Sequence, residues 1–304
     1  MIAILCPGQG AQTPGMLAPW LELPAVAASL SALSDAAGVD VVRHGTQSDA
    51  DTIRDTAVAQ PLLVATAIAT GRALLGDAVP AVAAGHSVGE LGAAALAGVL
   101  TDTDAMRLVA VRGAAMAAAA AAAEPTSMAA VLGGDPADVA AALEQHSLTP
   151  ANVNGGGQVV AAGTKAAIEA LVAAPPARAR VIELQVAGAF HTTFMVPAVA
   201  DLHDAATAVS PANPRRVLLS NADGAPVADG ADALARIVRQ VANPVRWDLC
   251  MEAMLQLGVT GLIEVAPGGV LTGLAKRAMK GVPAVALKTP DDLSAARELL
   301  EAAA

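Results

Sequence analysis

A serine between two glycines, at the junction of two contrasting segments, constrains the fold of this chain more than any other feature. The apolar residues 80–84 suit a short buried strand, the hexapeptide GHSVGE follows at 85–90, and apolar residues then recur at helical spacing over 88–99. Strand, tight turn and helix in this order predict a nucleophile elbow from which Ser87 projects outward. A chain with 27 glycines also produces G-x-S-x-G by chance, so the motif needs support from elsewhere.

Two stretches offer backbone N–H groups to an oxygen that gains negative charge. The first is the start of the predicted helix after Ser87, where unpaired N–H groups and the helix dipole favour an anion. The second is the loop PGQGAQ at 7–12, which follows the apolar run 2–6. A glycine-rich loop after a strand can bring its N–H groups to a ligand oxygen, and the two stretches together would form an oxyanion hole. A plain tight turn at 7–12 is the other interpretation.

The composition bounds the class of protein. The chain has 304 residues, 55% hydrophobic and 15% charged, which excludes disorder and allows one big domain or two unequal ones. Only 1% of the residues are aromatic, and the net charge is −10. Both stacking on bases and attraction to a phosphate backbone are therefore disfavoured, and we expect no nucleic-acid partner.

Targeting segments and metal motifs are not evident. Residues 1–6 lack the basic and longer apolar regions of a signal peptide, and the alanine-rich run 114–123 is too short to span a bilayer. The two cysteines, Cys6 and Cys250, show no metal-ligand spacing. We expect a cytoplasmic protein with reduced thiols, no bound metal and no membrane contact.

The order of the predicted elements indicates an α/β protein in two parts. The predicted strands are 2–6, 81–84, 216–220, 261–265 and 283–287, and the predicted helices are 24–37, 57–75, 88–98, 102–123, 193–208, 247–257 and 268–280. This alternation favours a parallel sheet covered by helices. Between 125 and 189 the order changes to β-α-β-β-α-β, typical of a ferredoxin-like unit. We predict a large α/β subdomain over 1–124 and 190–304, a small inserted subdomain over 125–189, and a ligand cleft between them.

Ser87 needs a base, because a serine hydroxyl is a poor nucleophile while it keeps its proton. His191 follows a strand-like run at the exit from the small subdomain, where a loop can present it across the cleft. A structural histidine is at least an equal interpretation from spacing alone. His86 lies inside the predicted turn, and we expect its side chain to point away from Ser87 and to pack or hydrogen-bond.

Arg112 lies on an otherwise apolar helix, about one turn from Leu108 and Met116. A charge on a core-facing stripe needs a partner. If no protein carboxylate supplies it, a substrate carboxylate can do so through a bidentate contact. Extension of the side chain to solvent is the competing interpretation.

Eight motifs, in order along the chain, resemble those of malonyl-CoA:acyl-carrier-protein transacylases, a family of acyltransferases in fatty-acid synthesis. The motifs are PGQGAQ at 7–12, TAVAQPLL at 56–63, GHSVGE at 85–90, VRG with a following methionine at 111–116, NVNG at 152–155, GAFH at 188–191, QVANPVRW at 240–247 and EVAPGGVLTGLAKR at 264–277. The resemblance implies an α/β-hydrolase-like large subdomain with a ferredoxin-like insert, which agrees with the pattern of elements.

The resemblance also implies the site residues. The nucleophile falls on Ser87 and the base on His191. Seven further residues fall on positions that contact the substrate or the base. The N–H groups of Gln9 and Val88 would form the oxyanion hole, and the main-chain carbonyl of Gln240 would orient the base. Arg112 would bind the malonyl carboxylate, and Gln60, Met116 and Phe190 would line the pocket. Phe190 resembles the malonyl-type sequence of polyketide acyltransferases, which implies that methylmalonyl-CoA is a poor substrate.

The implied reaction is a ping-pong transfer of the malonyl group from malonyl-CoA, through Ser87, to the phosphopantetheine thiol of acyl carrier protein. It requires no metal or redox cofactor, and we expect a monomer. Three other interpretations stay open. A serine hydrolase would use the same Ser87 and His191, usually with an acidic third residue, for which the sequence offers no strong candidate. A malonyl transferase of a polyketide or malonate-decarboxylase system would differ in its acceptor, and a non-catalytic scaffold would not need the intact site.

Overall fold

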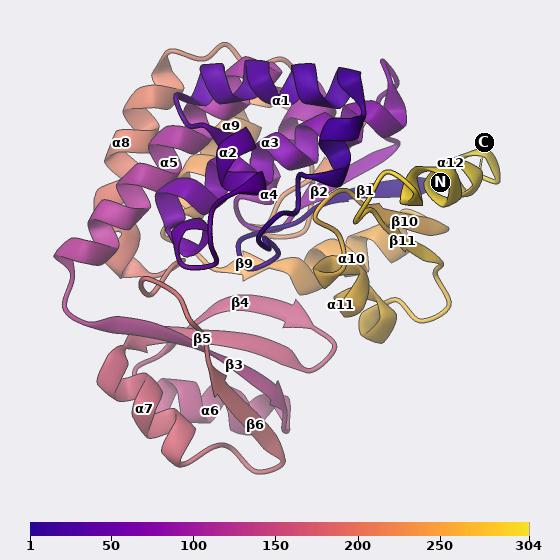
Figure 1. Ribbon diagram of the computed structural model, residues 1–304. Helices are drawn as coiled ribbons and strands as arrows, with labels where there is room; N and C mark the ends of the chain where they lie inside the picture. The colour runs from indigo at the N-terminus through magenta and orange to yellow at the C-terminus, as the bar shows by residue number, and fades with distance from the viewer. Residues whose placement is uncertain (304) are drawn as a thin grey trace.

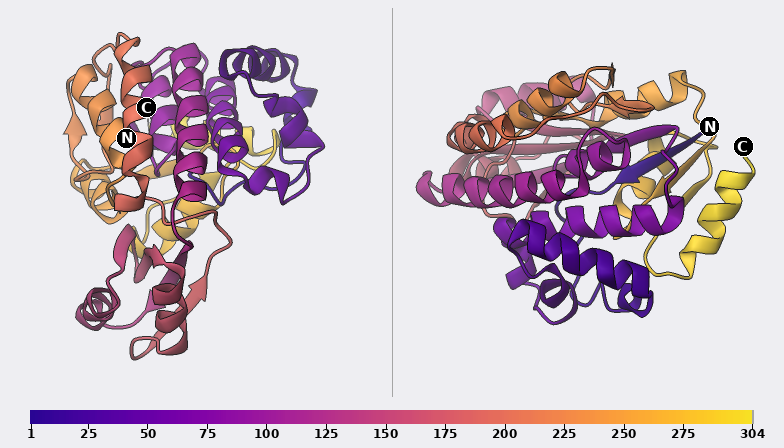
Figure 2. Two further views of the ribbon diagram at one scale, coloured as in Figure 1. Left: turned by 90° about the vertical axis from the view of Figure 1, so that its left-hand side faces the viewer. Right: turned by 90° about the horizontal axis from the view of Figure 1, so that it is seen from above.

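A computed structural model describes residues 1–303, which form two units, each built on its own sheet. The large, helix-rich unit occupies the upper part of Figure 1 and the small unit lies below it. Seen from the side, the small unit extends from one end of the large one (Figure 2).

The large unit contains a six-stranded sheet in the order β11-β10-β1-β2-β7-β8, parallel except for the edge strand β8. Its strands are β1 (Ile2–Cys6), β2 (Val82–Gly85), β7 (Val217–Leu219), β8 (Pro226–Val227), β10 (Gly261–Glu264) and β11 (Ala284–Ala286). The strands β1, β2 and β10 are buried along their whole length, as the near-continuous apolar runs of a covered parallel sheet require. The predicted α/β fold with a parallel sheet is confirmed.

The large unit is also rich in helices. They are α1 (Pro24–Ala37), α2 (Val41–Thr46), α3 (Thr56–Leu75), α4 (Gly89–Leu96), α5 (Asp102–Ala122), α8 (Val196–Thr207), α9 (Gly230–Gln240), α10 (Trp247–Gln256), α11 (Val270–Ala278) and α12 (Asp292–Glu301), with 3-10 turns at Pro19–Glu22, Thr52–Arg54 and Thr193–Met195. The sequence patterns did not predict α2, α9 or α12.

The two long apolar helices, α3 and α5, pack against each other. By length and composition each is able to cross a membrane, but 78% of the most apolar window of α3 and 50% of that of α5 lie buried inside the fold. The helices approach closely at Gly113, where a Cβ atom would lie 2.9 Å from the carbonyl oxygen of Thr56. This approach brings Arg112 of α5 within hydrogen-bond distance of Gln60 of α3.

The small unit contains a five-stranded sheet in the order β6-β3-β5-β4-β9. Four strands are its own, β3 (Thr126–Gly133), β4 (Thr149–Gly155), β5 (Gln158–Thr164) and β6 (Ala179–Glu183), and α6 (Pro136–Gln145) and α7 (Lys165–Ala173) pack on the sheet through one apolar cluster. These elements have the predicted β-α-β-β-α-β order. The fifth strand, β9 (Val245–Arg246), lies outside 125–189 and pairs parallel with β4. A two-residue strand is too short to show periodicity, so the sequence did not predict it.

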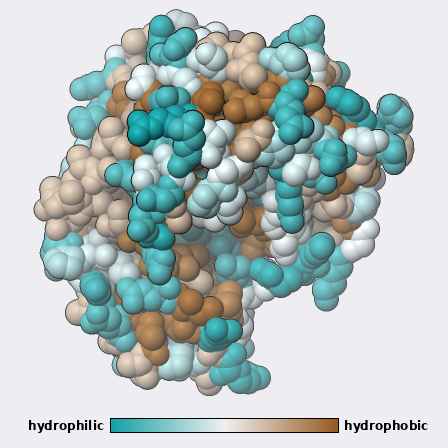
Figure 3. Space-filling model, viewed as in Figure 1, coloured by the Kyte–Doolittle hydropathy of each residue, from teal (hydrophilic) through white to brown (hydrophobic). Residues whose placement is uncertain are grey.

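A cavity of about 240 Å³ separates the two units. Its lining includes Gln60 and Ser87 of the large unit, and Met128, Asn152 and Val160 of the small one. The molecular surface is hollowed between the upper and lower units in the space-filling view (Figure 3). The cleft was expected at this boundary.

Candidate active site

Ser87 occupies the tight turn between β2 and α4. Its φ angle is +54°, in the left-handed region that side chains other than glycine adopt only where the surrounding structure holds them. The flanking glycines are required by space, because a Cβ atom at Gly85 would overlap the backbone of Gly89, and one at Gly89 would overlap the carbonyl of Cys6. The predicted strand, turn and helix are therefore present.

His191 faces Ser87 from the loop after the small unit. Its Nε2 atom lies 2.8 Å from Ser87 Oγ, and its Nδ1 atom lies 3.0 Å from the main-chain carbonyl oxygen of Gln240. Because a carbonyl only accepts, Nδ1 carries the proton and Nε2 is free to accept the serine proton. Gln240 Nε2 lies 3.1 Å from the same Nδ1, but a nitrogen that carries a proton does not accept a hydrogen bond. The acceptor for Gln240 Nε2 is then the main-chain carbonyl of Asn243 at 3.5 Å.

The environment of His191 keeps the imidazole neutral. Burial and, after it, the nearby Arg112 guanidinium lower the pKa of His191 to about 3, although the hydrogen bond to the Gln240 carbonyl acts in the opposite direction. The neutral ring is the form that accepts a proton. His191 therefore keeps its accepting form throughout the physiological pH range.

Arg112 lies beside Ser87 and is only 1% exposed. Its guanidinium donates to Oε1 of Gln60 at 2.7 Å, to Oε1 of Gln240 at 3.3 Å and to Ser87 Oγ at 3.3 Å. Burial lowers the pKa of Arg112 to about 10, so the group remains charged at neutral pH. Among residues 1–303 no carboxylate lies within ion-pair distance of it. The site thus holds a buried positive charge whose hydrogen-bond partners are all neutral.

The loop after β1 comes very close to the elbow. A Cβ atom at Gly8 would lie 2.7 Å from the carbonyl oxygen of His86, so a larger residue there would push the loop away. The loop is also tied to its surroundings by Gln9, whose side-chain amide donates to Thr56 Oγ1 at 3.3 Å. Within the described part of the chain, the backbone N–H of Gln9 donates to no acceptor.

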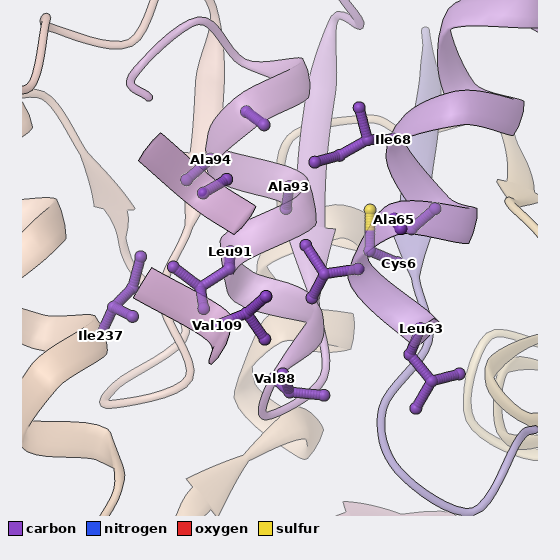
Figure 4. Close-up of a cluster of buried hydrophobic side chains, with 14 of the residues drawn as sticks. Cys6, Leu63, Ala65, Ile68, Val88, Leu91, Ala93, Ala94, Val109 and Ile237 are labelled. Carbon is purple, nitrogen blue, oxygen red and sulfur yellow. The ribbon is translucent and has the colours of Figure 1, made fainter. Parts of the chain in front are cut away.

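Val88, which follows the serine, leaves its own N–H free as well. Its side chain is 1% exposed and packs in the core cluster that contains Leu91 and Val109 (Figure 4). The Val88 N–H has no acceptor among residues 1–303, whereas the Ser87 N–H is bound to Asn221 Oδ1 at 2.7 Å. The predicted oxyanion-hole groups of Gln9 and Val88 are thus unpaired donors beside the serine.

The remaining predicted residues line the cavity. Gln60, Met116 and Phe190 are buried, and all three border it. Gln60 Nε2 donates to the Met116 sulfur at 3.4 Å while its Oε1 atom accepts from Arg112. The amide of Gln60 therefore connects the buried Arg112 to Met116, which lines the cavity.

His86 turns away from Ser87, as expected. Its Nε2 atom lies 2.9 Å from Asn154 Oδ1, and its ring meets that of Trp247 edge-on at 5.7 Å between centroids. The cysteines Cys6 and Cys250 are buried free thiols. Within residues 1–303, no group of three or more His, Cys, Asp or Glu side chains is placed to hold a metal ion.

Two buried polar residues beside the elbow were missed by the sequence analysis. Asn221 binds the elbow backbone, and Glu90 accepts the Asn221 N–H at 2.8 Å through Oε1. The other Glu90 oxygen is buried with no hydrogen-bond partner in the described chain. A usable signal existed for Glu90, which is the one charged residue in the apolar helix GELGAAAL. Asn221 stands in an irregular segment and carries no such signal.

We expect Glu90 to make the stability of the protein fall as the pH rises. Burial raises the pKa of Glu90 from 4.5 to about 8. The folded protein therefore keeps a proton that the unfolded chain has lost, so this contribution to stability is full below about pH 4.5 and is lost as the pH approaches about 8. Glu90→Gln should remove this loss, a difference of up to about 5 kcal/mol in the free energy of unfolding by denaturant titration.

The exposed Glu144 on α6 provides a matched control for that measurement. Glu144→Gln makes the same chemical change on the surface and should leave the pH dependence unchanged. If Glu90→Gln lost stability between about pH 5 and about pH 8 as steeply as the unaltered protein, another group would be responsible.

Comparison with known proteins identifies the family. The model of the acyl transferase domain matches residues 4–294. The malonyl CoA-acyl carrier protein transacylase of Mycobacterium tuberculosis is 51% identical over 297 residues, which cover 96% of this chain and 98% of that protein. The protein of the same name from Escherichia coli K12 is 38% identical over 307 residues, which cover 98% and 99%.

Solved structures agree with the sequence comparison. The crystal structure of MCAT from Mycobacterium tuberculosis superposes with a TM-score of 0.93 at 50% identity and covers 98% of this chain and 99% of that one. A complex described as a type II PKS acyl-carrier protein with its malonyl-transacylase gives a TM-score of 0.91 at 32% identity, with 98% and 99% covered. Since the family model spans nearly the whole sequence and full-length relatives exceed 30% identity, this chain belongs to the acyl transferase family.

Proposed function

We propose that this enzyme transfers the malonyl group from malonyl-CoA to the phosphopantetheine thiol of acyl carrier protein. The observation that carries the proposal is Arg112, a buried charged guanidinium 3.3 Å from Ser87 Oγ with only neutral partners. A substrate that bears both a thioester and a carboxylate satisfies the serine and the arginine together. The relatives named malonyl CoA-acyl carrier protein transacylase support this choice of donor and acceptor.

In the first half-reaction, Ser87 Oγ attacks the thioester carbon while His191 Nε2 takes the serine proton. The carbonyl oxygen becomes an oxyanion and accepts from the free N–H groups of Gln9 and Val88. Each such donor contributes about 3 kcal/mol to the barrier reduction in comparable sites. When the intermediate collapses, the C–S bond breaks, His191 returns the proton to the CoA sulfur, and a malonyl ester remains on Ser87.

The second half-reaction repeats these steps with the carrier protein. His191 takes the proton of the phosphopantetheine thiol, and the sulfur attacks the ester carbonyl of the malonyl-serine. The C–O bond breaks and the proton returns to Ser87 Oγ. We further propose that the enzyme needs no metal or redox cofactor and works as a cytoplasmic monomer.

Intact-protein mass spectrometry after mixing with malonyl-CoA tests the function. We expect an added malonyl group on Ser87 that holo acyl carrier protein discharges within seconds to minutes. Water-dependent loss of malonate at the same rate, with or without the carrier protein, would instead identify a hydrolase. Absence of any adduct under conditions where the protein is folded would exclude the proposed intermediate.

The acceptor is the one part of the proposal with a specific competitor. The malonyl-transacylase in the type II PKS complex mentioned above is 32% identical to this chain, so a polyketide carrier protein is a second candidate acceptor. Discharge rates measured with a fatty-acid and a polyketide carrier protein separate the two. The acceptor with the higher kcat/KM is the one that the enzyme prefers.

We expect methylmalonyl-CoA to be a poor donor. The buried Phe190 lines the cavity together with His191, so we expect its ring to crowd a methyl branch on the malonyl group. One misplaced methyl group in an apolar pocket changes kcat/KM by about 10- to 200-fold. Phe190→Ser should therefore raise the methylmalonyl to malonyl ratio of kcat/KM at least about tenfold.

The only other phenylalanine, Phe194, gives the matched control for this change because it does not border the cavity. Phe194→Ser should leave the ratio unchanged. Equal ratios for the unaltered protein and Phe190→Ser would show that the ring does not select the substrate.

A further inference from the structure

Asn221 lies next to the catalytic turn although it is 134 residues away from Ser87 in the sequence. The strands β2 and β7 are parallel neighbours, with Val82 opposite Val217 and Ala83 opposite Leu218. Their carboxyl ends therefore lie side by side. β2 leads into the elbow, and β7 leads through Ser220 to Asn221, so the topology places the Asn221 side chain against the turn.

The side chain of Asn221 binds both ends of the turn. Its Oδ1 atom accepts the N–H of Ser87 at 2.7 Å, and its Nδ2 atom donates to the carbonyl oxygen of Gly85 at 2.8 Å. The residue is 0% exposed, so water does not compete for these bonds. One side-chain amide thus holds both Gly85 and the nucleophile Ser87 in place.

The backbone of Asn221 is fixed as well. Its N–H donates to Glu90 Oε1 at 2.8 Å, and its carbonyl accepts the N–H of Arg246 at 2.8 Å. These partners belong to two separate elements, Glu90 to α4 and Arg246 to β9. The main chain of Asn221 therefore cannot shift without breaking these bonds, and its side-chain amide cannot rotate without losing the bonds to Ser87 and Gly85.

Two properties of the elbow depend on such a clamp. Ser87 is held at a φ angle of +54°, which a serine does not keep without external contacts. The Ser87 N–H is occupied by Asn221, so the next N–H, that of Val88, is the donor that remains free beside the serine. Loss of the clamp would move Oγ relative to His191 Nε2, and a displacement of about 1 Å can reduce a rate 100-fold.

We propose that Asn221 is a positioning residue for the acyl transfer, in which its side-chain amide holds Ser87 in the attacking geometry by binding Ser87 N–H and the Gly85 carbonyl together. The inference rests on the proposed function, because it takes Ser87 as the nucleophile. Asn221 touches no reacting atom and acts through the turn.

The variant Asn221→Asp gives a specific test, because only a protonated carboxyl reproduces the amide. When protonated, the introduced carboxyl accepts from Ser87 with one oxygen and donates to Gly85 with the other, whereas the ionised form turns a second acceptor toward a carbonyl oxygen. The titratable groups around the position are Glu90 on α4, Cys250 on α10, Asp223 in the turn after β7, Arg236 on α9, Asp248 on α10 and Arg112 on α5. Burial raises the pKa of such a carboxyl, as it does that of the neighbouring Glu90.

We expect Asn221→Leu to lower kcat about 100-fold with little change in the KM for malonyl-CoA. At about pH 9, the kcat of Asn221→Asp should be as low as that of Asn221→Leu. As the pH falls to about 6, the ratio of its kcat to that of the unaltered protein at the same pH should rise at least tenfold. Rates are counted per active site, from the amplitude of the malonyl-enzyme burst, so that a loss of folded protein does not lower them. The same comparison is repeated with Glu90→Gln present in both proteins, so that the ionisation of Glu90 does not contribute to the pH dependence.

Cys250→Ala is the matched control, since it removes the hydrogen bond that Asn221 Nδ2 donates to the Cys250 sulfur at 3.6 Å and leaves both bonds of Asn221 to the turn in place. Its rate per active site should stay within about threefold. Two results would overturn the positioning role. One is a ratio of kcat for Asn221→Asp to kcat for the unaltered protein that does not change with pH, and the other is a rate per active site near that of the unaltered protein for both Asn221→Asp and Asn221→Leu. Failure of the unaltered protein to form a malonyl adduct would overturn the proposed function instead, so the two failures are distinct.

Discussion

Ser87→Ala is expected to reduce malonyl transfer to acyl carrier protein by about 10⁵-fold or more and to abolish the malonyl adduct. Removal of a serine nucleophile from a comparable site costs about 2 × 10⁶ in kcat, because only the oxyanion hole and substrate binding then contribute to catalysis. Since Ser87 Oγ lies 2.8 Å from His191 Nε2, His191→Ala should cost nearly as much, and the double variant should be no slower than either single one. Stopped-flow transfer kinetics and intact mass measure both effects.

The chain contains a second serine and histidine pair that serves as the control. His44 Nδ1 lies 3.0 Å from Ser48 Oγ, but the pair does not border the cavity that Ser87 and His191 line. Ser48→Ala and His44→Ala should leave transfer within about twofold. Additive losses for Ser87→Ala and His191→Ala, or an adduct on Ser87→Ala, would contradict a single nucleophile and base unit.

The elbow was predictable because its information is local. Gly85 is imposed by the close backbone of the turn itself and Gly89 by the carbonyl of Cys6, but the G-x-S-x-G pattern that they form is local, and the neighbouring strand and helix have clear apolar patterns. The parallel sheet followed from the same kind of pattern, in which short apolar runs alternate with amphipathic segments. The family resemblance, carried by motifs spread over the chain, is confirmed by the comparisons.

The environment of Arg112 was only partly predictable. Helical spacing placed it on a core-facing stripe, and the structure confirms that it is buried and does not extend to solvent. Which neutral groups satisfy it depends on the contact of α5 with α3 and on a residue from α9, and neither contact is visible in the helix pattern. The role of Arg112 toward a substrate stays a prediction.

The helix α9 was missed although a signal for it exists. Its buried residues Ala233, Leu234, Ile237 and Val238 recur at helical spacing, but charged residues interrupt them and lower the overall apolar content. Gln240 ends this helix, so its carbonyl could be assigned to His191 only through the family resemblance. Asn221 and β9 show the same limit, because short irregular segments are positioned by tertiary contacts rather than by a period.

Arg112→Met is expected to lower kcat/KM for malonyl-CoA about 10²- to 10³-fold and that for acetyl-CoA far less. In the unliganded site, the guanidinium donates to Gln60, Gln240 and Ser87, which are all neutral. A malonyl carboxylate would replace neutral acceptors with a charged one, and the loss of a buried charge-assisted contact costs about 2 to 5 kcal/mol. An acetyl group makes no such contact, so its transfer loses little when the guanidinium is removed.

The matched control for this swap lies on the same helix. The Arg107 side chain is 69% exposed, and its ion pair with Asp104 is long at 4.0 Å. Arg107→Met should therefore leave kcat/KM for both malonyl-CoA and acetyl-CoA unchanged. Arg112→Lys separates charge from geometry, because an ammonium keeps the attraction to a carboxylate but lacks the planar fork of a guanidinium. Its kcat/KM for malonyl-CoA should lie between those of Arg112→Met and the unaltered protein. Equal losses of malonyl and acetyl transfer in Arg112→Met would mean that the guanidinium acts by holding Ser87 Oγ rather than by binding the substrate carboxylate, and the assignment of malonyl specificity to Arg112 would be wrong.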